Sequence, residues 1–366
     1  MQLRFISAIA PLGALAVASG CGSVESSTPD GAPIFDDAEV RGADASPAAD
    51  AAPRRDVEVP TDAAPEPEFR LPDSLTAFCT DSNTQVSCPT SGNFQGQDGD
   101  YRINVPEYEA RGDVVFDTVT LLSWTFAHQA AETLGDAEAH CADLASDNLG
   151  DLDDWRVPSR YELMTLFDYG NDSRMIPAAF ASYGEAPAMW TSTPFAGESG
   201  FGWLFNPQTG FLGFAELAEL AELDVEPLVR CVSGELPERT FEAINSDAVF
   251  DTRTRLTWQR ALVAEEALWR DALAGCEELE LDGHDDWRLP NAKEMMSIVA
   301  DTRTDPAFSS LFEQPGGENP SLAIWTSTPV PFSTTRAFII LIETGIIAPA
   351  INLTRDEFAA RCVRGP

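Results

Sequence analysis

A ten-residue segment occurs twice in the chain, first as Asp154–Leu163 and again as Asp286–Met295. Both copies read Asp-Trp-Arg, a hydrophobic residue, Pro and a polar residue. Five landmarks in register indicate a tandem duplication, and copies of about 130 residues suit two globular domains better than a solenoid. We expect the first domain over 77–236 and the second over 237–366. The other four landmarks are Trp124 and Trp258, Cys141 and Cys276, Trp190 and Trp325, and Cys231 and Cys362.

The repeated segment predicts a sharp change from extended chain to helix. Ser159 and Glu162 have the spacing of a capping box, and Asn291 and Glu294 repeat it. A proline before each cap favours extended backbone ahead of it. Apolar residues at helical spacing should continue the two helices: Leu163, Leu166 and Phe167 in the first copy, and Met295, Ile298 and Val299 in the second.

The other side chains of the segment are expected to be structural. Trp155 and Trp287 are most simply core residues, because a large aromatic side chain gains most from burial. Arg156 and Arg288 should pair with a nearby carboxylate rather than with a ligand.

Local patterns predict the remaining elements. Two strands around an Asp-Thr turn are expected over 115–124 and again over 249–258. Helices should carry Cys141 and Cys276. The apolar runs over 338–348, interrupted by Glu-Thr-Gly, predict a buried hairpin.

The cysteines predict three disulfides. With Cys21 set aside, six remain, and the duplication selects one pairing because each copy has one cysteine in a helix and one near its end. Metal binding by thiolates is the alternative, but the chain contains no Cys-x-x-Cys pair. Turn-forming residues between the first two cysteines predict a hairpin closed by its own bridge, and disulfides indicate an oxidising compartment. The expected bridges are Cys79–Cys88, Cys141–Cys231 and Cys276–Cys362.

The N-terminal residues 1–20 have the features of a signal peptide. Arg4 gives a positive start, Ile6–Val17 is a short apolar run, and Ala-Ser-Gly precedes Cys21. This ending resembles the bacterial lipobox, which implies cleavage before Cys21 and anchoring of the chain in a membrane by lipid on that residue. Gly22 favours the outer membrane over the inner. An ordinary cleaved signal peptide with an unmodified cysteine is the alternative.

Composition separates a tether from the folded part. Residues 21–76 are rich in Ala, Pro, Asp and Ser and have no hydrophobic periodicity, which predicts a disordered tether. The formal net charge of −37 repels phosphate backbones and sulfated glycans, so we exclude nucleic acid as a partner. Cationic partners or divalent metal ions suit such a charge. The alternative is a solvated acidic surface that only keeps the protein soluble.

The order of the landmarks, from the strand tryptophan through Asp-Trp-Arg-x-Pro and Trp-Thr-Ser-Thr-Pro to Arg-Cys-Val, resembles the Lcl C-terminal-domain family of secreted bacterial proteins. The resemblance covers about residues 77–366. It implies an α+β fold of the C-type-lectin-like group, with two helices against short antiparallel sheets in each copy and a disulfide from a helix to the last strand. The adhesin that named the family binds glycosaminoglycans through a basic domain. This acidic chain departs from it, and that ligand does not carry over.

A search for reactive groups predicts a non-catalytic protein without a cofactor. His128, His140 and His284 are the chain's histidines, and the cysteine beside His140 is assigned to a disulfide rather than to a nucleophile. Phosphate-binding loops and His-Glu-x-x-His are absent from the sequence. The motifs of calcium-dependent lectins are also absent, since Glu-Asn-Pro at 318–320 is in scrambled order.

Acidic loops before the two motif tryptophans give one metal hypothesis. Carboxylates crowded in a loop repel one another, and calcium with oxygen ligands relieves that repulsion. Solvated loop acids are the alternative, with Asp154 and Asp286 acting as local caps. The calcium candidates are Asp147, Asp151, Asp153, Asp282 and Asp285.

Together these features predict a lipid-anchored protein of the bacterial outer membrane that displays two lectin-like domains for adhesion or ligand recognition, with an unidentified protein or glycan as its partner. A structural envelope protein that binds neighbouring proteins is the alternative, followed by an enzyme of unknown type. Function is expected where the copies differ, at 195–227, 313–323 and 330–357. The tandem Ala-Glu-Leu at 215–223 fits neither strand nor helix and is expected to be a partly helical excursion.

Overall fold

The computed structural model describes residues 68–171, 175–181, 183, 188–217, 226–316, 320–331, 333–350 and 352–365. The predicted signal peptide and Cys21 lie outside these residues. The predicted boundary at 76 was too late, because Phe69, Leu71 and Ser74 are already buried. The apolar side chains of Phe69 and Leu71 join the core of the compact unit that contains both copies.

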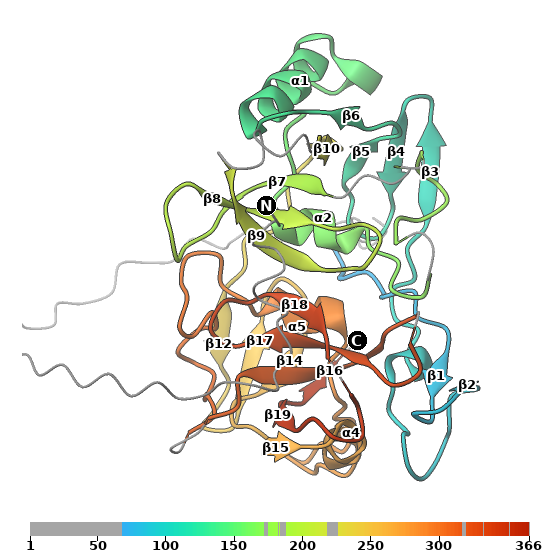
Figure 1. Cartoon of the computed structure of the whole chain (residues 1–366), viewed down its shortest axis with the longest axis vertical. Helices are drawn as coiled ribbons and strands as arrows, with labels where there is room; N and C mark the ends of the chain where they lie inside the picture. Colours follow the sequence, from blue (N-terminus) through green and yellow to red (C-terminus); the bar gives the residue numbers. More distant parts are fainter. Residues whose placement is uncertain are drawn as a thin grey trace, which may run out of the picture. The chain divides into compact units, whose positions relative to one another are not determined.

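A ten-stranded sheet runs through both copies in the described part of the chain (Figure 1). Its order from one edge to the other is β15-β19-β16-β17-β18-β9-β8-β7-β10-β6. The second copy supplies β15 (Ala264–Ala267), β19 (Phe358–Ala360), β16 (Ala323–Pro329), β17 (Ala337–Leu341) and β18 (Ile347–Pro349). The first supplies β9 (Leu212–Glu216), β8 (Phe201–Phe205), β7 (Met189–Pro194), β10 (Leu228–Val229) and β6 (Gln129–Ala130).

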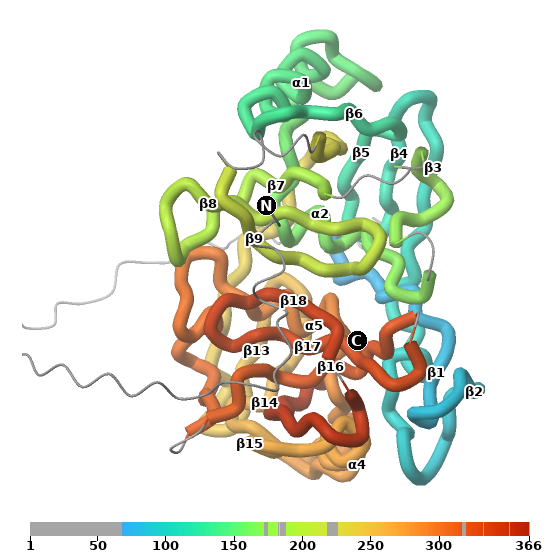
Figure 2. The backbone as a smooth tube through the Cα atoms, viewed as in Figure 1, coloured from blue at the N-terminus to red at the C-terminus, as the bar shows by residue number. Residues whose placement is uncertain are grey.

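The order of the sheet is mirrored about the contact between β9 and β18. These are equivalent strands of the two copies, and they pair antiparallel with Ile347 opposite Leu212. Figure 2 shows β9 of the first copy lying beside β18 of the second. Each strand covers the edge that the other would leave open, and open edges invite pairing with other chains. The copies therefore form one unit with a shared core rather than the two separate domains that were expected.

Each copy also has a four-stranded antiparallel sheet of its own, which contains the predicted pair of strands around the Asp-Thr turn. The chain crosses from the large sheet to the small one at Cys231 and Cys362, just after β10 and β19. The small sheets are β3 (Tyr108–Arg111), β4 (Val114–Asp117), β5 (Ser123–Thr125) and β11 (Val232–Ser233), and β12 (Phe241–Ala243), β13 (Ala248–Asp251), β14 (Thr257–Gln259) and β20 (Val363–Arg364).

Within the described residues, two α-helices per copy complete the α+β arrangement. The longer ones, α1 (Leu134–Ser146) and α4 (Trp269–Glu277), carry the predicted cysteines and lie toward opposite ends of the large sheet (Figure 1). The shorter ones, α2 (Arg160–Thr165) and α5 (Ala292–Ser297), follow the repeated motif and pack against each other. They are shorter than predicted, since Leu166 and Ile298 are their C-caps.

The local predictions for the hairpins are mostly confirmed. The first bridge closes the hairpin of β1 (Cys79–Thr80) and β2 (Gln85–Val86), and β17 pairs with β18 as the expected buried hairpin. The excursion over 215–223 was partly wrong, because Ala215 and Glu216 belong to β9. Residues 218–223 lie outside the described part. In that part, no helix has the length and apolar character needed to cross a bilayer.

The three predicted disulfides are present as Cys79–Cys88, Cys141–Cys231 and Cys276–Cys362. The two long ones tie α1 and α4 to the points where the chain changes sheets. They hold both layers of each copy together.

Candidate functional site

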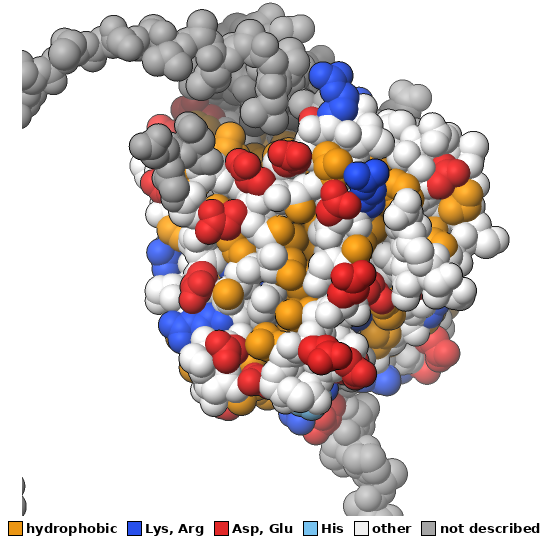
Figure 3. Space-filling view, turned by 90° about the horizontal axis from the view of Figure 1, so that it is seen from below, with side chains coloured by type: hydrophobic (Ala, Val, Ile, Leu, Met, Phe, Trp, Pro, Cys, Tyr) orange, Lys and Arg blue, Asp and Glu red, His pale blue; other side chains and the backbone are white. Residues whose placement is uncertain are grey.

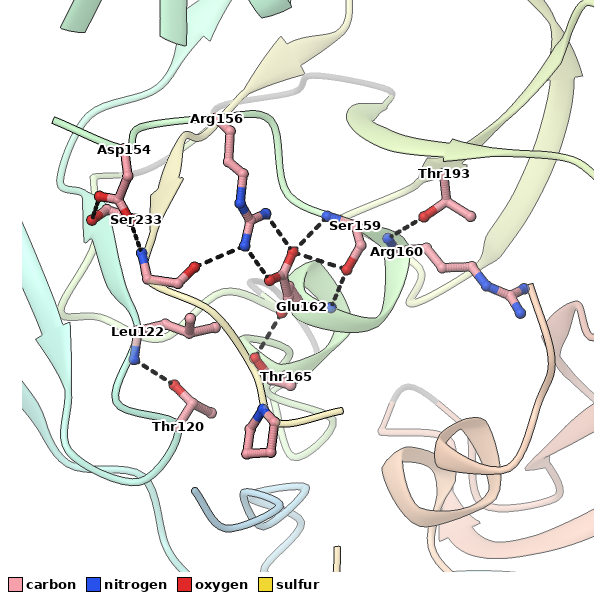
Figure 4. Close-up of polar contacts among 12 residues, drawn as sticks. Thr120, Leu122, Asp154, Arg156, Ser159, Arg160, Glu162, Thr165, Thr193 and Ser233 are labelled. Carbon is pink, nitrogen blue, oxygen red and sulfur yellow. Dashed lines mark hydrogen bonds and ion pairs between the residues drawn. The ribbon is translucent and has the colours of Figure 1, made fainter. Parts of the chain in front are cut away.

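The arginine of each repeated motif forms a fork with the glutamate of the capping box, and Figure 4 shows the fork of the first copy. Arg156 donates to the two carboxylate oxygens of Glu162 at 2.8 and 2.6 Å, and Nη2 also donates to the carbonyl of Gly234 at 2.8 Å. Arg288 and Glu294 repeat the fork at 2.7 and 2.6 Å. Both capping boxes are complete, as predicted. The carboxylates are held by structural bonds, and the pairing predicted for the arginines is confirmed.

A second landmark supports the same helices. The amide of Arg160 donates to Thr193 Oγ1 at 3.0 Å, and the amide of Ala292 donates to Thr328 Oγ1 at 2.9 Å. Both threonines come from Trp-Thr-Ser-Thr-Pro. The Asp-Trp-Arg motif starts a helix whose first backbone amides lack partners within the helix. The Trp-Thr-Ser-Thr-Pro motif supplies an acceptor for one of these amides, which explains why the two motifs recur together.

The motif tryptophans are core residues, as predicted. Trp155 and Trp287 are buried, and their indole nitrogens donate to Leu149 O at 2.9 Å and Leu281 O at 3.3 Å. The cap role expected for the preceding aspartates was wrong. Asp154 accepts from the hydroxyl of Ser233 and the amide of Gly234, and Asp286 pairs with Arg364 at 2.7 Å. Each aspartate therefore fastens the motif to the last strand of its copy.

The calcium candidates are not brought together. All five candidates are exposed, and Asp282 accepts from Asn245 Nδ2 at 2.7 Å. They are Asp147, Asp151, Asp153, Asp282 and Asp285. Within the described ranges, the one cluster with metal-ligand spacing is Cys79, Cys88 and Asp100. Its cysteines form a disulfide, which leaves no thiolate for a metal. The calcium hypothesis gains no support from this geometry.

Two buried cations cross between the copies, and sequence reasoning missed both. Arg160, on α2 of the first copy, pairs through Nε with Asp301 of the second. Lys293, on α5 of the second copy, donates through Nζ to Thr165 O of the first at 2.8 Å. Figure 4 shows the Arg160 side chain extending away from the Glu162 network toward the second copy. The two residues lie one position apart in the aligned motifs, where Arg160 matches Ala292 and Tyr161 matches Lys293.

Lys293 lies in a buried cluster of charges. Its Nζ also donates to Asp73 O at 2.8 Å. Burial lowers the pKa of Lys293 to about 8, and the charges of Asp73, Asp117 and Asp168 oppose that decrease. Burial raises the pKa of Asp98 to about 7, although a hydrogen bond from Thr328 at 2.6 Å favours its charged form. The cluster joins the segment before the first hairpin to both copies.

The buried carboxyl of Asp98 predicts a pH dependence of stability. Its folded pKa of about 7 lies above its ordinary 3.8, so the folded chain holds a proton that the unfolded chain has released between these values. Stability from this group therefore increases as the pH falls from about 7 toward 4. We expect a higher melting temperature at pH 5 than at pH 7.5, and a smaller difference in Asp98→Asn, whose amide resembles the protonated acid. If the melting temperatures of the wild type and of Asp98→Asn changed equally between pH 5 and pH 7.5, the raised pKa of Asp98 would be contradicted.

A cavity of about 230 Å³ opens where the two copies meet. The first copy contributes Arg160 and Tyr161, and the second contributes four charged side chains beside two buried apolar ones. Guanidinium groups therefore gather at one place in a chain with 60 acidic and 23 basic residues. Elsewhere the surface is acidic, and Figure 3 shows one face on which carboxylates are spread among apolar side chains and basic groups are fewer. The second copy's lining residues are Glu238, Arg239, Arg253, Asp301, Met296 and Val299.

The cavity lies outside the segments in which function was expected. A signal for it was present, because Arg160, Tyr161 and Arg253 match Ala292, Lys293 and Val119 of the other copy. Function was expected in whole segments over which the copies disagree, whereas these three differences are single substitutions inside matching segments. His140 offers no alternative site, because the thiol of Cys141 beside it is consumed in a disulfide.

Comparison with known sequences accounts for both copies. The Lcl C-terminal domain model matches residues 113–233 and again residues 247–364. The search of curated proteins found no match. The two matched segments cover more than half of the chain, and they contain the strand pair, the repeated motif and the long disulfide of each copy. The chain therefore belongs to the Lcl C-terminal domain family.

Proposed function

We propose that the protein is a lipid-anchored component of the bacterial outer membrane that presents its two copies as one non-catalytic binding unit for adhesion or ligand recognition. Membership of the Lcl C-terminal domain family carries the proposal, since this family suggests a surface-associated binding role. The lipobox-like sequence before Cys21 supports the anchor, and the three disulfides suit an oxidising compartment.

We also propose that each copy has the C-type-lectin-like fold. The supporting observations are two α-helices per copy among the described residues, a short antiparallel sheet, and a disulfide from the first helix to the last pair of strands. The joined sheet adapts this plan, because it fixes the two binding modules to each other. Such a unit offers a partner one composite surface rather than two modules on a flexible linker.

Protease treatment of intact cells tests the proposal. In Gram-negative bacteria that express the full chain, the domains should be cleaved from the surface while periplasmic markers stay intact. Cys21→Ala should remove the protein from the membrane fraction. Protection from protease would contradict surface display and favour the structural alternative, in which the unit contacts neighbouring envelope proteins. Glycan and protein arrays probed with the full chain would then identify the class of partner.

A further inference from the structure

The cavity between the copies holds three guanidinium groups that repel one another. Burial lowers the pKa of both Arg160 and Arg253, and the nearby charge of Arg239 lowers the two values further, while Asp301 favours the charged form of Arg160. Glu238 is the other acid on the lining. Among the lining side chains three guanidinium groups face two carboxylates, and Asp251, which is not on the lining, also favours the charged form of Arg253. The lining itself therefore suits an anion with a single negative charge rather than one with several.

Two hydrogen-bond donors on the lining are buried and have no partner among the described residues. They are Nη1 of Arg160 and the hydroxyl of Tyr161, in side chains that are 2% and 7% exposed. A buried donor without an acceptor costs about 1–3 kcal/mol, and more when it is charged. Both side chains come from adjacent positions on α2, and both line the cavity. A bound acceptor would satisfy them together.

Aromatic rings and backbone carbonyls hold the guanidinium groups in place. Arg160 lies over the Trp203 ring at 4.2 Å, Arg253 over the Tyr161 ring at 5.3 Å, and Arg239 donates to the carbonyls of Ser297 and Val299 at the end of α5. Stacking occupies the faces of the planar groups and leaves N–H groups at their edges. Fixed donors lose little entropy when they bind a planar acceptor.

We propose that this cavity binds a carboxylate group. The proposal names a ligand class for the binding function proposed above and rests on it. Arginine donors in a fork match the two oxygens of a carboxylate, and the tyrosine hydroxyl supplies a third donor. A dianion such as phosphate would bring its second charge close to Asp301 and Glu238. The volume suits a small organic acid or the carboxylate end of a larger chain rather than a whole large ligand.

Calorimetric titration of the oxidised full chain at low chloride tests the assignment. The probes are acetate, inorganic phosphate, and the dipeptide N-acetyl-Gly-Gly with a free or an amidated C-terminus. We expect acetate to bind more tightly than phosphate. A dipeptide that binds more tightly than acetate and loses binding on amidation identifies a chain end as the ligand. Acetate that binds at least as tightly as the dipeptide identifies a small acid.

Matched variants locate the binding. Tyr161→Phe removes one donor and should weaken acetate binding about tenfold. Its control, Tyr169→Phe, removes a hydroxyl that is also buried and unpaired but lies outside the cavity, and it should bind like the wild type. Arg253→Gln should weaken binding by a similar factor. Arg255→Gln makes the same charge change two residues away, off the lining, and should not.

Three results would overturn the proposal: no acetate binding by the wild type, phosphate bound more tightly than acetate, or equal binding by Tyr161→Phe and Tyr169→Phe. These results leave surface display untouched, because protease treatment of cells reads that property separately. Conversely, the chain could be protected from protease on intact cells and still bind acetate through Tyr161. That result would refute surface display and leave the carboxylate site in the cavity supported. Failure of the inference and failure of the proposed function are therefore distinguishable.

Discussion

Replacing Arg288 with alanine is expected to lower the free energy of unfolding by about 3–5 kcal/mol, because it leaves the carboxylate of Glu294 buried without its cation. Both side chains of this pair are almost fully buried, at 5% and 6% exposure. Arg288 also lies 5.1 Å from the Tyr101 ring, so the substitution removes packing as well. Chemical denaturation of the oxidised full chain measures the loss.

The first copy supplies the control for this prediction. Arg156 makes the same fork with Glu162, but its side chain is 39% exposed. Water can reach the carboxylate once this arginine is removed, so Arg156→Ala should cost on the order of 1 kcal/mol. Equal losses in the two variants would show that burial does not determine the strength of this ion pair.

Removing either long disulfide should have an effect of similar size. The bridges Cys141–Cys231 and Cys276–Cys362 close loops with sequence separations of 90 and 86. Replacing both cysteines of one bridge with alanine is expected to cost about 4–5 kcal/mol, because the unfolded chain regains the entropy of a large loop. Each change should also loosen the link between a helix and the crossing point of the two sheets.

The hairpin bridge provides the comparison. Cys79–Cys88 has a sequence separation of 9, and its removal should cost about 2–3 kcal/mol by the same loop-entropy reasoning. Denaturation midpoints of the three double variants, measured in one buffer, test this order. A loss from the hairpin variant that matches the long-loop variants would contradict it.

The features that were predicted correctly depend on short-range chemistry or on the duplication. The capping box of Ser159 and Glu162 involves residues three apart, so its spacing is visible in the sequence. Pairing of Cys141 with Cys231 follows because Cys276 and Cys362 occupy the same positions. The burial of Trp155 follows from its size. Each of these needs no knowledge of how the two copies meet.

The features that were missed depend on contacts between distant residues. Arg160 and Lys293 lie near the starts of short helices, where a cation is ordinarily solvated. The packing of α2 against α5, together with contacts to other distant segments, buries them. The joining of β9 to β18 depends on two strands whose edges fit, and an alternating pattern identifies a strand but not its neighbour. The aspartates that were considered as calcium ligands are the opposite case. They lie close together in the sequence, but the fold does not bring them together in space.

The meeting of β9 with β18 has a consequence for how the cavity could arise. Two identical single-copy chains joined by equivalent strands would form a symmetric dimer, in which every residue near the axis occurs twice. An arginine at position 160 would then be accompanied by a second arginine at the position that Ala292 occupies here. Because both copies belong to one polypeptide, each side of the axis can change independently. The duplicated chain can therefore hold Arg160 and Tyr161 on one side and Ala292 and Lys293 on the other, which gives a single asymmetric pocket that no homodimer could build.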